Sequence, residues 1–215
     1  MDKAIEGFVM FAVNQGGVCT CPSRALIQEN IYDQFIERCL ERTKAIVMGD
    51  PLDMNTMMGA QASNDQYEKI LNYIDVGKQE GAEVLLGGEK FDNPVHPNGL
   101  YIKPTIFKGN NKMRIFQEEI FGPVLVIATY ESEEEALALA NDSIYGLSGG
   151  VWSADAERAM AFARGMRTGQ VSINGGPFNI SAPFGGYKMS GNGRELGVHG
   201  LEEFLETKSI QRPVE

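Results

Sequence analysis

The sequence has few cysteines, a deficit of positive charge and no long apolar run. Only Cys19, Cys21 and Cys39 occur among its 215 residues, and an odd, sparse set without framework spacing argues against a disulfide-stapled secreted domain. Nineteen Lys and Arg stand against 29 Asp and Glu, which gives a net charge of −10. This excess of acidic residues argues against nucleic acid or an anionic membrane as a partner.

Membrane spans and export signals are also missing from the sequence. No stretch approaches the roughly 18 uninterrupted apolar residues of a transmembrane helix. The start, MDKAIEG, lacks the cationic and then apolar pattern of a signal peptide. With 43% hydrophobic and 22% charged residues, the composition is that of an ordinary globular domain. Because the sparse cysteines fit a reducing compartment, we expect a cytoplasmic protein.

Helical and strand-like segments alternate along the chain. Apolar spacing predicts helices over residues 3–13, 31–47 and 63–79, with Asn30 capping the second and Ser63 or Asn64 capping the third. Strand-like segments occupy residues 23–27, 83–86, 101–107 and 124–130. The acidic run 131–135 then opens another helix, and the alternation continues to residue 173. This order predicts an α/β layered domain with a largely parallel open sheet flanked by helices.

The glycine-rich stretch after Asn174 is too irregular for a regular element and predicts a long functional loop. Gly191, Gly193 and Gly197 nearly spell a dinucleotide fingerprint, but the last interval is one residue too long and no strand precedes them. His96 and His199 lack the spacing of metal ligands. We therefore expect no metal site.

Cys19 has the most suggestive local surroundings in the chain. It follows a predicted helix end and the loop formed by residues 14–17, where exposed backbone amides can stabilise a thiolate or an oxyanion. The competing interpretation is a small buried hydrophobic residue, which is the usual fate of a cysteine. Position in the loop makes the two interpretations about equal, and Cys19 is the candidate nucleophile.

Three ordered motifs resemble those of the aldehyde dehydrogenase superfamily. The first has an aromatic pair, then Asn14-Gln15-Gly16, Cys19 and Arg24. The second is the run EEIFGPV at residues 118–124, and the third is PFGGYKMSG at residues 183–191. Similarity to the C-terminal catalytic domain of that family covers essentially the whole chain. The run CTCPSRAL looks closest to bacterial enzymes that act on small aliphatic aldehydes.

The resemblance implies a reaction and a role for Cys19. In that family a cysteine thiolate adds to the aldehyde carbonyl, and the cysteine N–H helps to hold the oxyanion. Hydride then passes to NAD or NADP, and the resulting thioester is hydrolysed to a carboxylic acid. Cys19 inherits the nucleophile and this N–H donor.

Other residues receive roles by the same resemblance. Glu119 would bind the ribose hydroxyls of the nicotinamide half of the cofactor, and Phe121 would pack beside the nicotinamide ring. Gln66 and Lys69 match positions that reach the cofactor, although an ordinary exposed helix face explains them nearly as well. Phe184, joined by Phe178, would line an apolar substrate tunnel, with plain core packing as the alternative.

The family's dinucleotide-binding domain, general-base glutamate and oxyanion asparagine lie upstream of the cysteine motif. Since only eighteen residues precede Cys19, we expect the chain alone to be inactive as a dehydrogenase and not to hold the cofactor stably. A stand-alone thiol esterase and a non-catalytic assembly module stay open as alternatives. We divide the chain into a catalytic domain, 1–196, and a C-terminal segment, 197–215. Residues 207–211 of that segment resemble the family's oligomerisation strand, which implies a homo-oligomer.

Overall fold

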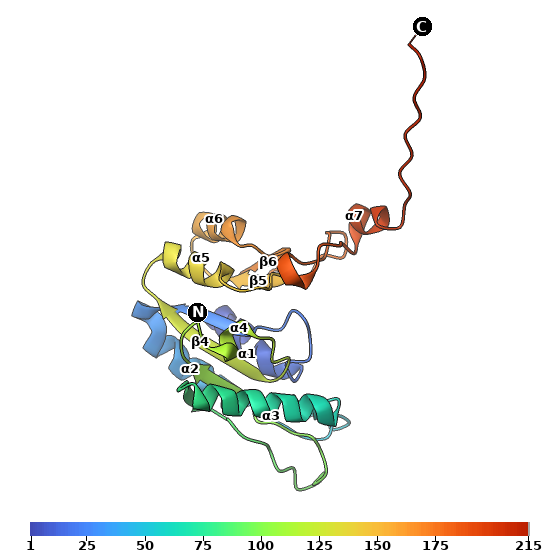
Figure 1. The fold of residues 1–215 in the computed structure, drawn as a ribbon. Helices are drawn as coiled ribbons and strands as arrows, with labels where there is room; N and C mark the ends of the chain where they lie inside the picture. Colours follow the sequence, from blue (N-terminus) through green and yellow to red (C-terminus); the bar gives the residue numbers. More distant parts are fainter. Residues whose placement is uncertain (215) are drawn as a thin grey trace.

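A computed structural model describes residues 1–214 as a mixed α/β fold (Figure 1). Its main sheet has four strands in the order β1-β4-β3-β2, and a separate parallel pair is formed by β5 and β6. The main-sheet strands are β1 (Arg24–Gln28), β2 (Glu83–Leu86), β3 (Thr105–Lys108) and β4 (Val124–Tyr130). Because β1, β4 and β3 run parallel and only the edge strand β2 is antiparallel, the predicted largely parallel sheet is confirmed.

The described residues contain seven α-helices, of which the last lies apart from the strands, next to the extended tail (Figure 1). The helices are α1 (Asp2–Val13), α2 (Tyr32–Lys44), α3 (Asn64–Gln79), α4 (Arg114–Gln117), α5 (Glu133–Asn141), α6 (Ala156–Gly165) and α7 (Gly197–Glu202). The smaller pair consists of β5 (Ser148–Val151) and β6 (Gln170–Ile173), and it lies with α5 and α6 at one end of the molecule (Figure 1). None of the helices in residues 1–214 is long and apolar enough to cross a membrane.

Strand β4 is buried on both faces, which explains its unbroken apolar sequence. Successive side chains of a strand point to opposite faces. Leu125 and Ile127 pack into one core cluster with α1 and α2, while Val124 and Val126 pack into a second cluster with α3 and α4. The sheet is therefore the middle layer between two pairs of helices.

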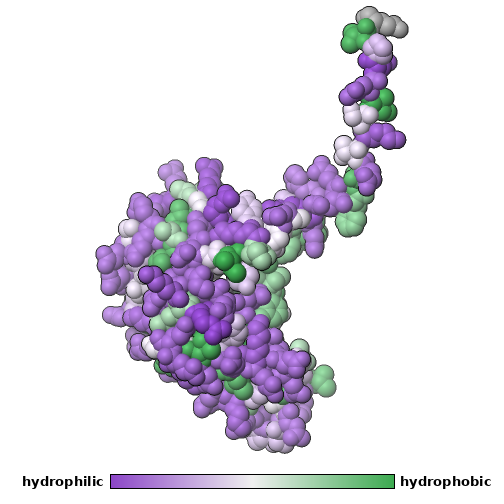
Figure 2. All heavy atoms as spheres, in the orientation of Figure 1, coloured by the Kyte–Doolittle hydropathy of each residue, from purple (hydrophilic) through white to green (hydrophobic). Residues whose placement is uncertain are grey.

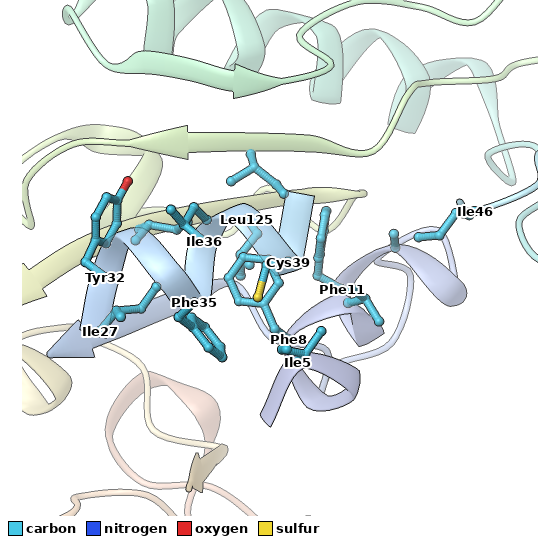
Figure 3. Packing of buried hydrophobic residues seen from close by; sticks show 14 of the residues in the cluster. Ile5, Phe8, Phe11, Ile27, Tyr32, Phe35, Ile36, Cys39, Ile46 and Leu125 are labelled. Carbon is cyan, nitrogen blue, oxygen red and sulfur yellow. The ribbon is translucent and has the colours of Figure 1, made fainter. Parts of the chain in front are cut away.

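The first cluster is built around aromatic contacts between helices (Figure 3). Phe8 of α1 meets Phe35 of α2 edge-on with ring centroids 5.8 Å apart. Cys39 is fully buried beside them. Packing of this kind fixes the axis of α1, and hence the point at which the chain leaves α1 toward Cys19.

Two expected elements differ from the structure in detail. The strand expected over residues 101–107 is interrupted, because only β3 pairs in the sheet and Ile102 makes an isolated bridge with Lys90. Pro104 stands between them and has no N–H to donate to a ladder. Asn30 does not cap the second helix, since residues Glu29–Ile31 form a 3-10 turn that leads directly into α2. The Ser63 cap is confirmed: its hydroxyl accepts from Gln66 N–H.

Residues beyond α7 leave the body as an extended tail (Figure 1). Residues 207–211 pair with no strand in the described part of the chain. An oligomerisation strand would find its partner in another subunit, so that assignment and the domain division at residue 196 stay predictions.

Candidate active site

The turn after α1 has an unusual backbone that delivers the chain to Cys19. Gln15 and Gly16 both adopt left-handed conformations, with φ of 53° and 66°. Gly17 N–H closes the turn on the Asn14 carbonyl over 2.8 Å. The side-chain amide of Gln15 donates from its nitrogen to the Asn14 carbonyl, and its oxygen accepts from the Gly59 N–H over 3.1 Å. This contact ties the turn to the segment that precedes α3.

Cys19 itself lies at the surface. It belongs to a second turn, which is closed by Cys21 N–H donating to the Val18 carbonyl over 2.9 Å. Within residues 1–214 the Cys19 N–H has no hydrogen-bond acceptor. A reachable thiol and an unengaged N–H are thus available at one residue, as nucleophilic attack with oxyanion stabilisation requires.

The other two cysteines are less suited to nucleophilic chemistry. Cys21 is half-buried, and burial raises the pKa of its thiol. Cys39 is fully enclosed in the core, where burial raises its pKa to about 12. Because the thiolate is the reactive form, both are disfavoured relative to a surface thiol. The buried-hydrophobe interpretation fits Cys39 and not Cys19.

The second motif lies directly against the turn of residues 14–17, which leads to Cys19. A Cβ added to Gly16 would stand only 1.8 Å from the carbonyl oxygen of Gly122. No side chain larger than hydrogen fits between the two backbones at this point. Motifs more than a hundred residues apart in sequence therefore meet through two glycines.

Adjacent carboxylates in the second motif have different environments. Glu118 accepts two hydrogen bonds from Arg114, of 2.8 and 2.9 Å, and one of 2.8 Å from the Tyr73 hydroxyl. The bonds from Arg114 hold the pKa of Glu118 below its usual range. Glu119 is exposed, and its carboxylate has no hydrogen bond or ion pair with residues 1–214. Glu119 is thus free for a ligand, whereas Glu118 holds the segment in place.

Phe121 is half-exposed and has a left-handed φ of 57°. The side-chain amide of Gln66, on α3, donates to the carbonyls of Ile120 and Phe121 over 3.1 and 2.5 Å. Lys69, one turn further along α3, is exposed, with its ammonium 5.9 Å from the centre of the Tyr73 ring. Of the two helix residues expected at the cofactor, Gln66 therefore already binds protein groups.

Phe184 of the third motif and Phe178, which precedes that motif, form an aromatic pair. Phe178 and Phe184 meet edge-on with centroids 5.8 Å apart. Among residues 1–214, no hydrogen bond or aromatic contact joins them to Cys19 or Phe121. The structure thus joins the first and second motifs directly and leaves the position of this pair relative to Cys19 a prediction.

Other clusters offer little chemistry. A cavity of about 410 Å³ is lined by residues that include Asp50, His96 and Tyr101, but by none of the predicted site residues. His96 pairs with Asp50 over 3.1 Å. In the described residues, no three His, Cys, Asp or Glu side chains are grouped so that they could hold a metal ion.

A family model for the aldehyde dehydrogenases matches residues 1–210. The chain belongs to the aldehyde dehydrogenase family. It is 58% identical over 211 residues to an aldehyde dehydrogenase of Deinococcus radiodurans, and 57% identical over 212 residues to acetaldehyde dehydrogenase 2 of Cupriavidus necator. These matches cover 98% and 97% of this chain but only 41% and 42% of the relatives. The chain thus spans about two fifths of their length.

A solved structure of betaine aldehyde dehydrogenase from Staphylococcus aureus, in complex with NAD+, has the same fold over this region. It superposes with a TM-score of 0.93 at 42% identity. The match covers 96% of this chain and 42% of that one. Fold and family therefore agree with the resemblance seen in the three motifs.

Two residues of the aldehyde dehydrogenase motifs have structural roles that the sequence did not reveal. Arg24, in the first motif, donates to the carbonyls of Leu139 and Ala140 over 3.0 and 2.9 Å. Lys188, in the third, donates to the carbonyls of Asn141 and Ser143 over 2.7 and 2.8 Å. Together they satisfy carbonyls at the C-terminal end of α5, where cations are favoured. No local pattern could have paired either residue with a helix so distant in sequence.

Proposed function

We propose that this chain carries the nucleophile and part of the cofactor-facing surface of an enzyme that oxidises an aldehyde to a carboxylic acid. The observation that carries the proposal is the contact between Gly16 and Gly122. The contact brings the turn of residues 14–17, which leads to the exposed Cys19, against the segment that includes Glu119.

The chemistry assigned to Cys19 follows from its exposure and its free N–H. The thiolate adds to the aldehyde carbon and forms a C–S bond, while the carbonyl electron pair moves to oxygen. The Cys19 N–H then donates to the developing oxyanion. After oxidation the acyl group remains on Cys19 as a thioester, which water hydrolyses to the acid.

NAD or NADP is the cofactor that family membership implies, and two residues fit it. Glu119 has an acceptor-only carboxylate without a protein partner, as hydrogen bonds from ribose hydroxyls require. Phe121 presents an exposed ring for packing beside a flat heterocycle. A bound nicotinamide would supply the hydride acceptor that cysteine lacks. The chain alone is not expected to hold this cofactor stably, and Lys69 is kept as a weaker candidate contact.

The substrate class we propose is a small aliphatic aldehyde. The Cupriavidus relative is an acetaldehyde dehydrogenase, and the run CTCPSRAL resembles that of bacterial enzymes for small aliphatic aldehydes. The apolar rings of Phe178 and Phe184 would form part of the substrate wall. The Staphylococcus structure is that of a betaine aldehyde dehydrogenase. Betaine aldehyde is cationic and not a simple aliphatic aldehyde, so the family accommodates more than one type of aldehyde.

Assembly into a homo-oligomer is a further part of the proposal. Apolar side chains of α7 and the tail are exposed, among them Phe204 at 88% and Ile210 at 86% (Figure 2). An extended segment with unpaired backbone groups is suited to adding a strand to a sheet of another subunit.

Cysteine labelling tests the proposed nucleophile. We expect iodoacetamide at pH 7 to alkylate Cys19 first, at least about tenfold faster than Cys39, because Cys39 is buried with a pKa of about 12. Mass spectrometry of peptides follows each site over time. Exposure alone would give the same order, so the decisive comparison is Cys19 in the folded chain against Cys19 in urea. Faster alkylation in the folded chain, by about threefold or more, indicates activation by the turn.

Equal rates for Cys19 in the folded and unfolded chains would contradict the proposal that this chain holds an activated nucleophile. A burst of alcohol release from an activated ester, lost in Cys19→Ser but kept in Cys39→Ser, would instead support the thiol esterase alternative. Concentration-dependent association that is unaffected by Cys19→Ser, without any thiol activation, would support the assembly module.

A further inference from the structure

The side chain of Gln66, on α3, binds the backbone of the second motif. Its amide nitrogen reaches across from α3 and donates to two consecutive carbonyls, those of Ile120 and Phe121. Its backbone N–H is separately occupied by the Ser63 hydroxyl at the helix cap. The side chain can therefore be changed without removing the cap.

The segment that Gln66 binds has a backbone that needs support. Phe121 has a φ of 57°, in the left-handed region. This conformation is unfavourable in free energy for any residue that has a Cβ, and it persists only when the surrounding structure fixes it. Gly122, the next residue, is held against Ile70 of the same helix, since a Cβ there would lie 2.5 Å from that side chain. Helix α3 thus holds this turn through the two hydrogen bonds of Gln66 and the apolar contact of Ile70.

The Phe121 turn, held by α3, supports the loop of residues 14–17 that leads to Cys19. Gly16 contacts the backbone of Gly122 with no side chain between them. A shift of the Phe121 turn therefore changes the surface on which residues 14–17 rest. The path from Gln66 to Cys19 consists of two hydrogen bonds, one backbone contact and one short loop.

We propose that Gln66 is a positioning residue, which holds the Phe121 turn in its left-handed form and thereby fixes the loop that carries Cys19. This inference rests on the proposed function in one respect, namely that Cys19 and Phe121 face one reacting centre. It differs from a direct ligand contact, because the donor end of the amide is already bonded to protein carbonyls.

The experiment compares three single variants of the whole chain. Gln66→Met keeps the length of the side chain but has no donor, and Gln66→Lys keeps donors for the two carbonyls. Glu68→Gln, on an exposed position of the same helix, is the matched control. Amide hydrogen exchange is measured in peptides covering residues 118–124 and 14–21, and Cys19 alkylation is measured from pH 6 to 9.

We expect Gln66→Met to speed exchange about threefold or more in both peptides, although the side-chain hydrogen bonds of Gln66 go only to Ile120 and Phe121 in the first. The hydrogen-bonded amides of Gly17 and Cys21 report this loosening. Cys19 alkylation near neutral pH should slow by a similar factor. Gln66→Lys and Glu68→Gln should stay within about twofold of the parent chain.

Faster exchange confined to residues 118–124, or a lower melting temperature with unchanged exchange in residues 14–21, would overturn the positioning role. If Gln66→Met does not fold, Gln66→Asn replaces it, because the shorter side chain withdraws the amide while keeping its polarity. The exchange comparison stays decisive even if Cys19 in the parent chain proves to be an ordinary thiol. Failure of the proposed nucleophile and failure of this inference are thus distinguished.

Discussion

Gly16→Ala is expected to lower the free energy of unfolding by about 3 kcal/mol and to separate the two motifs of the site. Two costs add. The residue has a φ of 66°, and its new methyl group would stand 1.8 Å from the Gly122 carbonyl oxygen and 2.1 Å from the carbonyl carbon. Both neighbours are backbone atoms, which cannot move aside as a flexible side chain would. Urea unfolding measures the loss.

The neighbouring glycine provides a matched control for this substitution. Gly17 lies outside the left-handed region, and a Cβ there would meet only the Asn14 carbonyl oxygen, at 3.4 Å. Gly17→Ala should therefore change stability by less than about 1 kcal/mol. Equal losses in the two variants would contradict the close backbone contact between the motifs. A large loss in Gly16→Ala alone, with faster hydrogen exchange in residues 118–124, would support it.

The sequence predicted the layers of the fold well because hydrophobic periodicity is a local signal. Strands 83–86 and 124–130 have the predicted bounds, and the Ser63 cap forms as expected. The errors lie where one residue changes local hydrogen bonding. Pro104 interrupts the strand expected over 101–107, and a 3-10 turn takes the place of the cap expected from Asn30.

The candidate site was predictable in its composition but not in its internal contacts. Motif resemblance identified Cys19, Glu119 and Phe121, and the structure presents all three at the surface. Resemblance could not tell that Glu118 is held by Arg114 while Glu119 is free. Arg114 stands only four residues before Glu118, but the Tyr73 hydroxyl that also binds Glu118 comes from a segment 45 residues away. That contact is set by packing between helices, which periodicity does not encode.

Arg24 illustrates the same limit, and its replacement should have the second large effect. The guanidinium donates to the Leu139 and Ala140 carbonyls and to the side-chain oxygen of Asn111, the last over 2.8 Å. Burial lowers the pKa of Arg24, yet the side chain stays charged because an arginine pKa is so high. Arg24→Leu would leave these half-buried acceptors without their donor, and we expect a loss of about 3 kcal/mol in the free energy of unfolding.

Lys188 supplies the comparison, because it binds carbonyls at the same helix end but is exposed. Water can replace its ammonium, so Lys188→Met should cost less than about 1 kcal/mol. The loss for Arg24→Lys should fall between these two, since lysine keeps the charge but has fewer donors to span the four acceptors of Arg24. Urea titration of the three variants ranks them. If Arg24→Leu cost no more stability than Lys188→Met, the half-buried hydrogen bonds of Arg24 would not be what secures the C-terminal end of α5.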